Sequence, residues 1–182
     1  MKPRWTFVAI AFVAVLVAFG AVRPAYAAAS STPADAEADA PVVRPLADWP
    51  ALRDLNGARI DPRSWRGVPT VVVFWATWCE FCRRHNPRID ALHRSVDERR
   101  LRVIGIAVDG PADKVRRHVA QAGYHFPIML DTAGLRARFS NRRIVPMTCV
   151  VNVDGRLLQC IPGEMSEADV LDLARLALPA GS

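Results

Sequence analysis

The chain has 182 residues, of which 51% are hydrophobic, and a formal net charge of +6. This length allows one folded domain with a single core. Three of the cations precede residue 28, so residues 28–182 carry only +3. The remaining arginines are scattered, without interleaved aromatic residues or a nucleic-acid-binding motif, which favours a solvated surface. We therefore expect no nucleic-acid partner.

The first 27 residues have the pattern of an export signal. Lys2 and Arg4 precede an uncharged apolar stretch over residues 5–22, and Ala25-Tyr26-Ala27 then places small residues at the positions read by a signal peptidase. The stretch is also just long enough to span a bilayer. Residues 1–27 are predicted to be a signal peptide or an uncleaved membrane anchor. Either alternative places the remaining chain outside the cytoplasm, in a bacterial periplasm, where disulfides persist.

Two further parts follow the export signal. Residues 28–45 are rich in Ala, Ser, Pro and Asp, show no apolar period, and predict a flexible leader. Residues 46–182 form the predicted domain. Its first elements are a hairpin around Asn56-Gly57, closed by residues 64–67, a strand over residues 68–76 that is buried on both faces, and a helix over residues 79–96.

The second half of the domain alternates in the same way. A buried strand over residues 101–108 precedes a helix over residues 111–122, which starts at Pro111 and stops at Gly123. The remaining predicted elements are a strand over residues 126–130, a brief helix to Phe139 capped by Asp131 and Thr132, a hairpin of residues 147–153 and 156–161, and a last helix opened by a capping box at Ser166. This order predicts an α/β fold, with a mixed central sheet flanked by helices on both faces.

Two cysteines, Cys79 and Cys82, stand where the first buried strand ends and a helix begins. The first turn of a helix has free N–H groups and a partial positive charge, so a thiolate at Cys79 is stabilised and can act as a nucleophile near neutral pH. Cys82, one turn further on, can resolve a mixed disulfide. The spacing predicts dithiol–disulfide chemistry in which this pair is the redox group and no other cofactor is needed.

Other uses of a Cys-x-x-Cys pair are less well supported. Covalent haem attachment needs His directly after the second cysteine, where this chain has Arg83. No second Cys-x-x-Cys or His-x-x-x-His follows at a distance suited to zinc. A copper or other metal carrier that uses Cys79, Cys82 and His85 stays open as an alternative. A purely structural disulfide across two residues would constrain little of the unfolded chain.

Residues 74–82, Phe-Trp-Ala-Thr-Trp-Cys-Glu-Phe-Cys, resemble the active-site segment of thioredoxin-like proteins in the extracytoplasmic TlpA/ResA/DsbE branch. Segments 126–132, 144–148 and 154–156 support the resemblance, which extends over residues 52–178. It implies a thioredoxin-like fold with an N-terminal hairpin, an inserted αβ element between residues 101 and 139, and thiol–disulfide oxidoreductase activity.

The resemblance also implies a substrate-binding surface beside Cys79. It places a cis peptide bond before Pro146, facing the redox pair; cis bonds are mostly confined to proline. Val145 would then offer its backbone to a client chain by strand-like pairing, and Trp78 would contribute to client binding. The implied partners are client proteins with disulfides or thiols and a membrane dithiol donor that reduces the enzyme again.

The chain departs from the family pattern at three positions near the redox pair. Val73 replaces the buried Asp of thioredoxins, and Phe81 replaces a frequent Pro. His85 replaces the Glu of ResA-like members and is either an acid–base group or a surface histidine. Glu80 adds a charge that disfavours a thiolate at Cys79 and raises its pKa. A less stable thiolate favours a reductase over an oxidase.

A second pair of cysteines, Cys149 and Cys160, flanks the Asp154-Gly155 turn. A two-residue turn would place the two cysteines directly opposite each other. A four-residue turn, which the resemblance favours, would make them diagonal neighbours at the limit for a disulfide. A structural disulfide and two buried free thiols both stay open.

The sequence therefore predicts an exported thiol–disulfide oxidoreductase that acts mainly as a reductant. Its clients could be apocytochrome c, oxidase-assembly proteins or other secreted thiols. A disulfide oxidase or isomerase is the alternative, although residues 28–45 are too short and too polar to supply the dimerisation domain of a usual isomerase. Peroxidase activity is disfavoured because the Thr-x-x-Cys arrangement of peroxiredoxins is absent.

Overall fold

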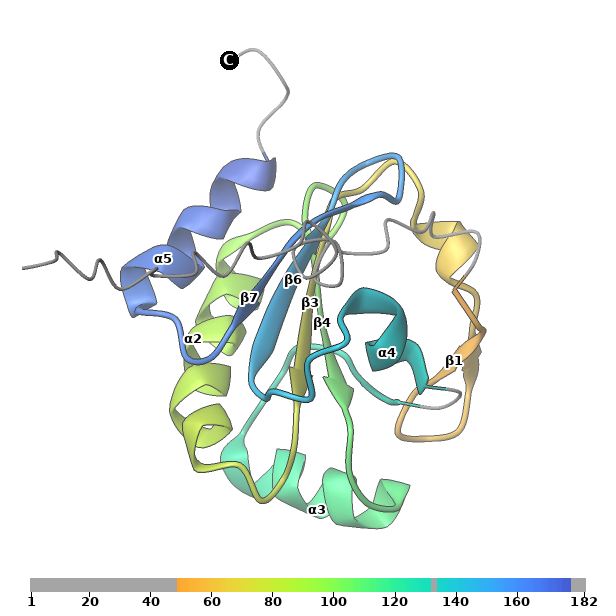
Figure 1. Cartoon of the computed structure of the whole chain (residues 1–182), viewed down its shortest axis with the longest axis vertical. Coiled ribbons are helices and arrows are strands. Elements are labelled where there is room, and N and C mark those ends of the chain that lie inside the picture. The colour runs from red at the N-terminus through yellow and green to blue at the C-terminus, as the bar shows by residue number, and fades with distance from the viewer. Residues whose placement is uncertain (1–48, 132–133, 178–182) are drawn as a thin grey trace, which may run out of the picture. The chain divides into compact units, whose positions relative to one another are not determined.

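A mixed sheet forms the centre of the fold. Its strands are β3 (Thr70–Trp75), β4 (Arg102–Ala107), β5 (Ile128–Leu130), β6 (Met147–Val151) and β7 (Leu157–Pro162). The order is β5-β4-β3-β6-β7, with β3, β4 and β5 parallel and β6 antiparallel to both of its neighbours (Figure 1). This computed structural model describes residues 49–131 and 134–177. The predicted mixed central sheet is confirmed.

Helices cover both faces of the sheet (Figure 1). They are α2 (Glu80–Ser95), α3 (Ala112–Ala122), α4 (Leu135–Phe139), α5 (Glu167–Asp172) and the 3-10 helix η4 (Leu173–Ala177). Alternate side chains of a strand point to opposite faces. Val73 and Trp75 of β3 accordingly pack in the core beneath α2, α3 and α5, whereas Phe74 packs with Phe139 of α4 on the other face. β3 is therefore buried on both faces, as its apolar sequence predicts.

A small hairpin precedes the sheet. It consists of β1 (Leu52–Arg53) and β2 (Arg59–Ile60), and the 3-10 helix η2 (Pro62–Trp65) follows. Gly57 has a φ of 84°, which glycine adopts without steric cost. The Asp54 side chain accepts the N–H groups of Asn56 and Ala58 at 2.9 and 2.8 Å. The hairpin predicted from Asn56-Gly57 is confirmed.

The brief helix that ends at Phe139 begins later than the sequence predicts. α4 starts at Leu135, and its N-cap is Gly134 with a φ of 67°, not Asp131. Asp131 instead accepts the backbone N–H of Arg136 at 3.2 Å, so its carboxylate reaches the first turn of α4 from outside the helix. Asp131 therefore satisfies a first-turn N–H as predicted, but the N-cap position belongs to Gly134. Thr132 lies outside the described residues.

A disulfide joins Cys149 on β6 to Cys160 on β7, where the two residues are directly opposed with Cα atoms 4.1 Å apart. The turn has three residues, 153–155, because the backbone N–H of Asn152 donates to the carbonyl of Arg156 at 2.9 Å. A register shift at Val150/Val151 corrects the offset that this turn introduces. Both alternatives drawn from the sequence treat the hairpin as regular. The structure instead combines a three-residue turn and a register shift with directly opposed cysteines.

The predicted signal peptide or membrane anchor (residues 1–27) and the predicted leader (residues 28–45) lie outside the described residues. Among residues 49–131 and 134–177, no helix is both long enough and apolar enough to cross a bilayer. The two described stretches fall within residues 46–182, the part of the chain that the sequence predicts to be the folded domain.

Candidate functional site

The redox pair lies at the junction of β3 and α2. Cys79 is the N-cap of α2 and has an extended backbone (φ −83°, ψ 112°). Its Sγ accepts the N–H of Cys82 at 3.1 Å, and its carbonyl accepts the N–H of Arg83 at 3.2 Å. Cys79 and Cys82 are joined by a disulfide and are only 4% and 1% exposed. One free N–H at the helix start is thus already aimed at the Cys79 sulfur, which is the arrangement that stabilises a thiolate.

The segment before β6 closes over the redox pair. The Val145–Pro146 peptide bond is cis, as the resemblance implies, and Pro146 is buried. The carbonyl oxygen of Val145 lies 3.5 Å from the Cys79 Sγ. Val145 is half-buried, so its backbone stands at the border between the redox pair and solvent.

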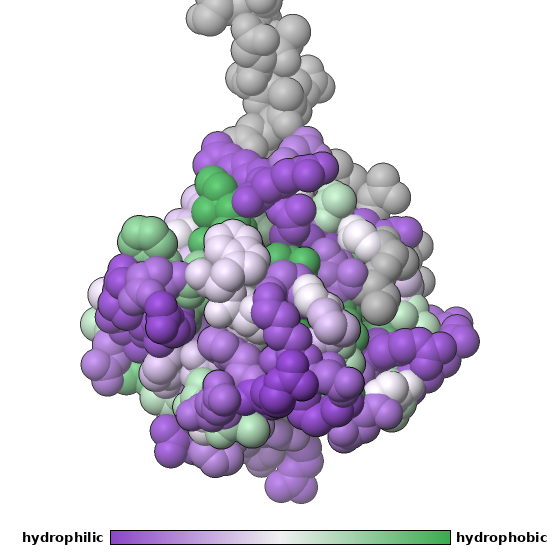
Figure 2. All heavy atoms as spheres, turned by 90° about the horizontal axis from the view of Figure 1, so that it is seen from below, coloured by the Kyte–Doolittle hydropathy of each residue, from purple (hydrophilic) through white to green (hydrophobic). Residues whose placement is uncertain are grey.

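Apolar side chains are exposed close to the redox pair. Trp78 is 68% exposed, Phe81 is 57% exposed, and Ile144, which adjoins Val145, is 43% exposed. We call these three residues the apolar rim. Figure 2 views the molecule from the end where the β3–α2 loop and α3 lie; hydrophilic side chains dominate this face, and apolar ones gather in small separate areas. Exposed large apolar side chains near a reactive group are typical of a binding surface.

Asp109 holds the loop between β3 and Cys79 and was not found from the sequence. Its carboxylate accepts the N–H and the hydroxyl of Thr77 at 2.8 and 2.6 Å, and Lys114 Nζ at 2.9 Å. Burial acts to raise the pKa of Asp109, but these hydrogen bonds outweigh it and hold the pKa below its usual value. One sequence feature could have revealed this role: Asp109 comes just after a buried strand that is parallel to β3. Parallel strands end at the same edge of a sheet, so a carboxylate there lies near the end of β3.

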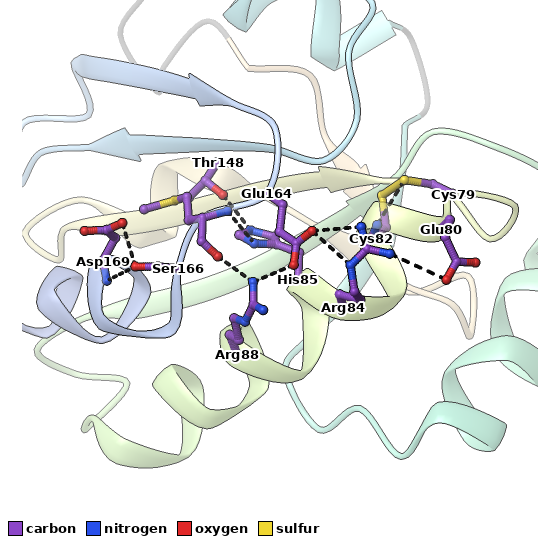
Figure 3. A network of polar contacts seen from close by, with 11 residues as sticks. Cys79, Glu80, Cys82, Arg84, His85, Arg88, Thr148, Glu164, Ser166 and Asp169 are labelled. Atoms are coloured by element: carbon purple, nitrogen blue, oxygen red, sulfur yellow. Dashed lines mark hydrogen bonds and ion pairs between the residues drawn. A yellow bond between two sulfur atoms is a disulfide. The ribbon is translucent and has the colours of Figure 1, made fainter.

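His85 is fully buried, so its interpretation as a surface histidine is wrong. Its Nδ1 accepts the N–H of Met165 at 3.3 Å, and its Nε2 lies 3.0 Å from the Thr148 Oγ1 (Figure 3). The proton of the neutral ring therefore sits on Nε2 and is donated to Thr148. Burial, and then the charge of Arg88, lower the pKa of His85 to about 4.

This environment changes what His85 can do at the redox pair. With a pKa of about 4 the ring is neutral at pH 7, so it supplies no imidazolium charge for the Cys79 thiolate. Both ring nitrogens already have hydrogen-bond partners, which also removes His85 from a ligand set with Cys79 and Cys82. Within the described stretches, no three His, Cys, Asp or Glu side chains gather to hold a metal ion.

Glu80 is exposed and is neutralised by its neighbours. It forms ion pairs with Arg83 and, at 3.6 Å, with Arg84. Arg84 also pairs with Glu164 at 3.1 Å, and Arg88 donates to Glu164 at 2.7 Å (Figure 3). The two arginines beside Glu80 oppose its effect on a Cys79 thiolate. The sequence argument from Glu80 alone therefore overstates its influence on redox poise.

The chain is similar to a known protein family and to known thiol-disulfide oxidoreductases. Residues 44–159 match the AhpC/TSA family. The thiol-disulfide oxidoreductase ResA of Bacillus subtilis is 26% identical over 128 residues, which cover 70% of this chain and 72% of that protein. ResA of Halalkalibacterium halodurans is 29% identical over 128 residues, which cover 70% and 73%.

Solved structures give the same fold. A secreted disulfide oxidoreductase of Mycobacterium tuberculosis, homologous to E. coli DsbE, has a TM-score of 0.61 at 24% identity, covering 71% of this chain and 95% of that one. A thioredoxin-family thiol:disulfide interchange protein of Chlorobium tepidum TLS has a TM-score of 0.62 at 24% identity, covering 74% and 97%. The thioredoxin-like fold implied by the resemblance is thereby confirmed. The chain belongs to the AhpC/TSA family and is a thiol–disulfide oxidoreductase that carries a Cys79–Cys82 pair.

Proposed function

We propose that this enzyme works outside the cytoplasm and reduces disulfides in client proteins, with Cys79 as the nucleophile and Cys82 as the resolving thiol. The observation that carries this proposal is the position of the Cys79 sulfur. It lies at the N-cap of α2 with the Cys82 N–H 3.1 Å away, and it faces the Val145 carbonyl at 3.5 Å. The Cys79 sulfur therefore has beside it both the N–H that stabilises its thiolate and the Val145 backbone with which a client chain can pair.

The reaction proceeds in two exchanges. The Cys79 thiolate attacks one sulfur of the client disulfide, forms a mixed disulfide and releases the other client sulfur as a thiolate. The Cys82 thiolate then attacks the Cys79 sulfur, which forms the Cys79–Cys82 disulfide and releases the second client thiolate. The client gains two electrons and the enzyme loses two.

Client binding would use the backbone beside Pro146 and the apolar rim. A client strand next to Val145 can pair through main-chain groups, which demands little of the client's sequence. Trp78, Phe81 and Ile144 would cover the apolar side chains that flank the client cysteines. This division allows several clients to share one site.

The proposed compartment is the periplasm of a bacterium. It is supported by the export pattern of residues 1–27 and by two disulfides in one domain, since disulfides persist in oxidising compartments. One relative in fold is named as secreted. We also propose that a membrane dithiol protein reduces the enzyme again, and that its clients include proteins of cytochrome c or oxidase assembly.

An oxidase is the second candidate, and the surroundings of Glu80 favour it. Arg83 and Arg84 pair with Glu80, and the N–H of Cys82 already points at the Cys79 sulfur. Both features stabilise a thiolate, and a more stable thiolate makes the disulfide a stronger oxidant. Glu80, next to Cys79 in the chain, acts in the opposite direction.

The direction of electron flow can be measured with a peptide that carries one internal disulfide. We expect the pre-reduced enzyme to convert the oxidised peptide to the dithiol while one Cys79–Cys82 disulfide forms per peptide, as counted by mass spectrometry after alkylation. The reciprocal mixture of oxidised enzyme and reduced peptide should react little. Fast oxidation of the peptide in the reciprocal mixture would establish the oxidase instead.

A further inference from the structure

Cys82 has to ionise in a place that disfavours charge. Its side chain is 1% exposed and lies in the apolar core with Val73 and Ile89. Burial raises the pKa of a thiol, yet Cys82 must become a thiolate to attack the mixed disulfide. Val73 has no polar side-chain atom, and His85 is engaged with Thr148 and Met165. A hydrogen-bond donor for the Cys82 sulfur must come from another residue.

Asn86 offers such a donor. It is 0% exposed, and neither its Nδ2 nor its Oδ1 has a hydrogen-bond partner among the residues that the structure describes. It stands four residues after Cys82 on α2, and both side chains belong to the buried face of this helix. Residues four apart are neighbours on a helix surface, and a helical side chain leans back over the preceding turn. Asn86 therefore stands one turn from Cys82 on the same buried face of α2.

An unpaired amide in the core needs an explanation, because a buried polar group without a partner destabilises a fold. The Tyr124 hydroxyl is a polar neighbour of Asn86. Burial raises the pKa of Tyr124, and the Asn86 side chain is close enough to its hydroxyl to lower that pKa as a hydrogen-bonding neighbour does. The distance and angle between the two groups nevertheless fall short of a hydrogen bond. The amide is thus close to a phenol that leaves it unsatisfied in the disulfide form.

We propose that Asn86 is the hydrogen-bond donor to the Cys82 sulfur in the resolving step, an inference that rests on the proposed role of Cys82. In the disulfide form the Cys82 sulfur is held at Cys79. When that bond opens, the side chain can turn, and Asn86 Nδ2–H donates to the thiolate. The Cys82 proton leaves to the client thiolate released in the first exchange. The thiolate then forms the bond to the Cys79 sulfur, and the second client thiolate departs.

The test uses Asn86→Leu and Asn86→Ala in the full chain, with Ile89→Val as a packing control on the same buried face. One measurement is the lifetime of the mixed disulfide with an oxidised peptide. The other is the pH dependence of Cys82 alkylation in a Cys79→Ser background. We expect resolution to slow by about tenfold or more and the alkylation profile to move up by about one pH unit, the effect of one lost hydrogen bond to a charged group. Ile89→Val should change neither.

Stability separates this role from a structural one. Removing an unpaired buried amide should leave the unfolding temperature unchanged or raise it. The proposal is overturned if the Asn86 variants leave the mixed-disulfide lifetime and the Cys82 alkylation profile unchanged. It is also overturned if these variants lose as much stability as Tyr124→Phe and show no redox change. Failure of the proposed function gives a different result. The wild-type enzyme would then not reduce the peptide, but the pH dependence of Cys82 alkylation in the Cys79→Ser background could still be compared with and without Asn86.

Discussion

Cys79→Ser is expected to lower disulfide-reductase activity by about three orders of magnitude or more, because a serine hydroxyl cannot attack a disulfide sulfur under conditions where a thiolate can. Cys82→Ser should behave differently. Its Cys79 still attacks the client, but no thiol releases the mixed disulfide, so the enzyme reacts once and remains attached. Turnover of a disulfide-linked fluorogenic peptide measures the first effect, and non-reducing gels with mass spectrometry measure the second.

The matched control is the Cys149→Ser/Cys160→Ser double variant, which removes the other disulfide of the domain. It should retain exchange activity, because this bond joins β6 to β7 and is separate from the redox pair. Client adducts that appear only with Cys79→Ser would reverse the roles of the two cysteines. The absence of adducts with either variant would contradict the proposed two-step exchange.

His85→Gln is expected to remove a large part of the acid sensitivity of the fold. The pKa of His85 is about 4 in the folded chain and about 6.5 in an unfolded one, so only the unfolded chain binds this proton between these values. The contribution to stability is complete above pH 6.5 and is lost as the pH falls to 4. The wild type should therefore lose about 3 kcal/mol more unfolding free energy than the variant over this range.

Urea unfolding at pH 7, 6, 5 and 4 measures this difference. His125→Gln is the control, because it removes an imidazole that is 65% exposed. Glutamine at position 85 can still donate and accept hydrogen bonds without titrating, so the variant should fold. Parallel stability curves for the wild type and His85→Gln would show that His85 is not the group that makes the fold acid-sensitive.

The elements whose burial is complete were the most predictable from the sequence. β3 after Thr70 and β4 after Arg102 are unbroken runs of buried apolar residues and glycine, and a strand buried on both faces needs no alternation. The position of the redox pair followed from the end of one such run and the start of a helical pattern. The N-cap role of Ser166, whose Oγ accepts the N–H of Asp169 at 3.1 Å, followed from local sequence as well, because a cap joins residues only three apart.

Features that depend on distant partners could not be predicted in the same way. His85 has a place in the helix pattern, but only the packing of α2 against β6 and the Met165 segment shows that its ring is buried. Asp109 lies 32 residues from the Thr77 backbone that it holds. The register of the β6–β7 hairpin depends on a bulge at Val150/Val151, which the turn residues alone do not reveal. The late start of α4 at Leu135 likewise follows a glycine with positive φ that the sequence pattern did not mark as a cap.

The equilibrium reduction potential of the Cys79–Cys82 couple tests the central claim most directly. It is obtained by equilibrating the enzyme in glutathione buffers, quenching with an alkylating reagent and counting the two cysteines by mass spectrometry, with the Cys149–Cys160 pair as a separate readout. A reductant should have a potential nearer to that of thioredoxin, about −270 mV, than to that of the strong periplasmic oxidant, about −120 mV. A potential above about −160 mV would contradict the account and identify an oxidase.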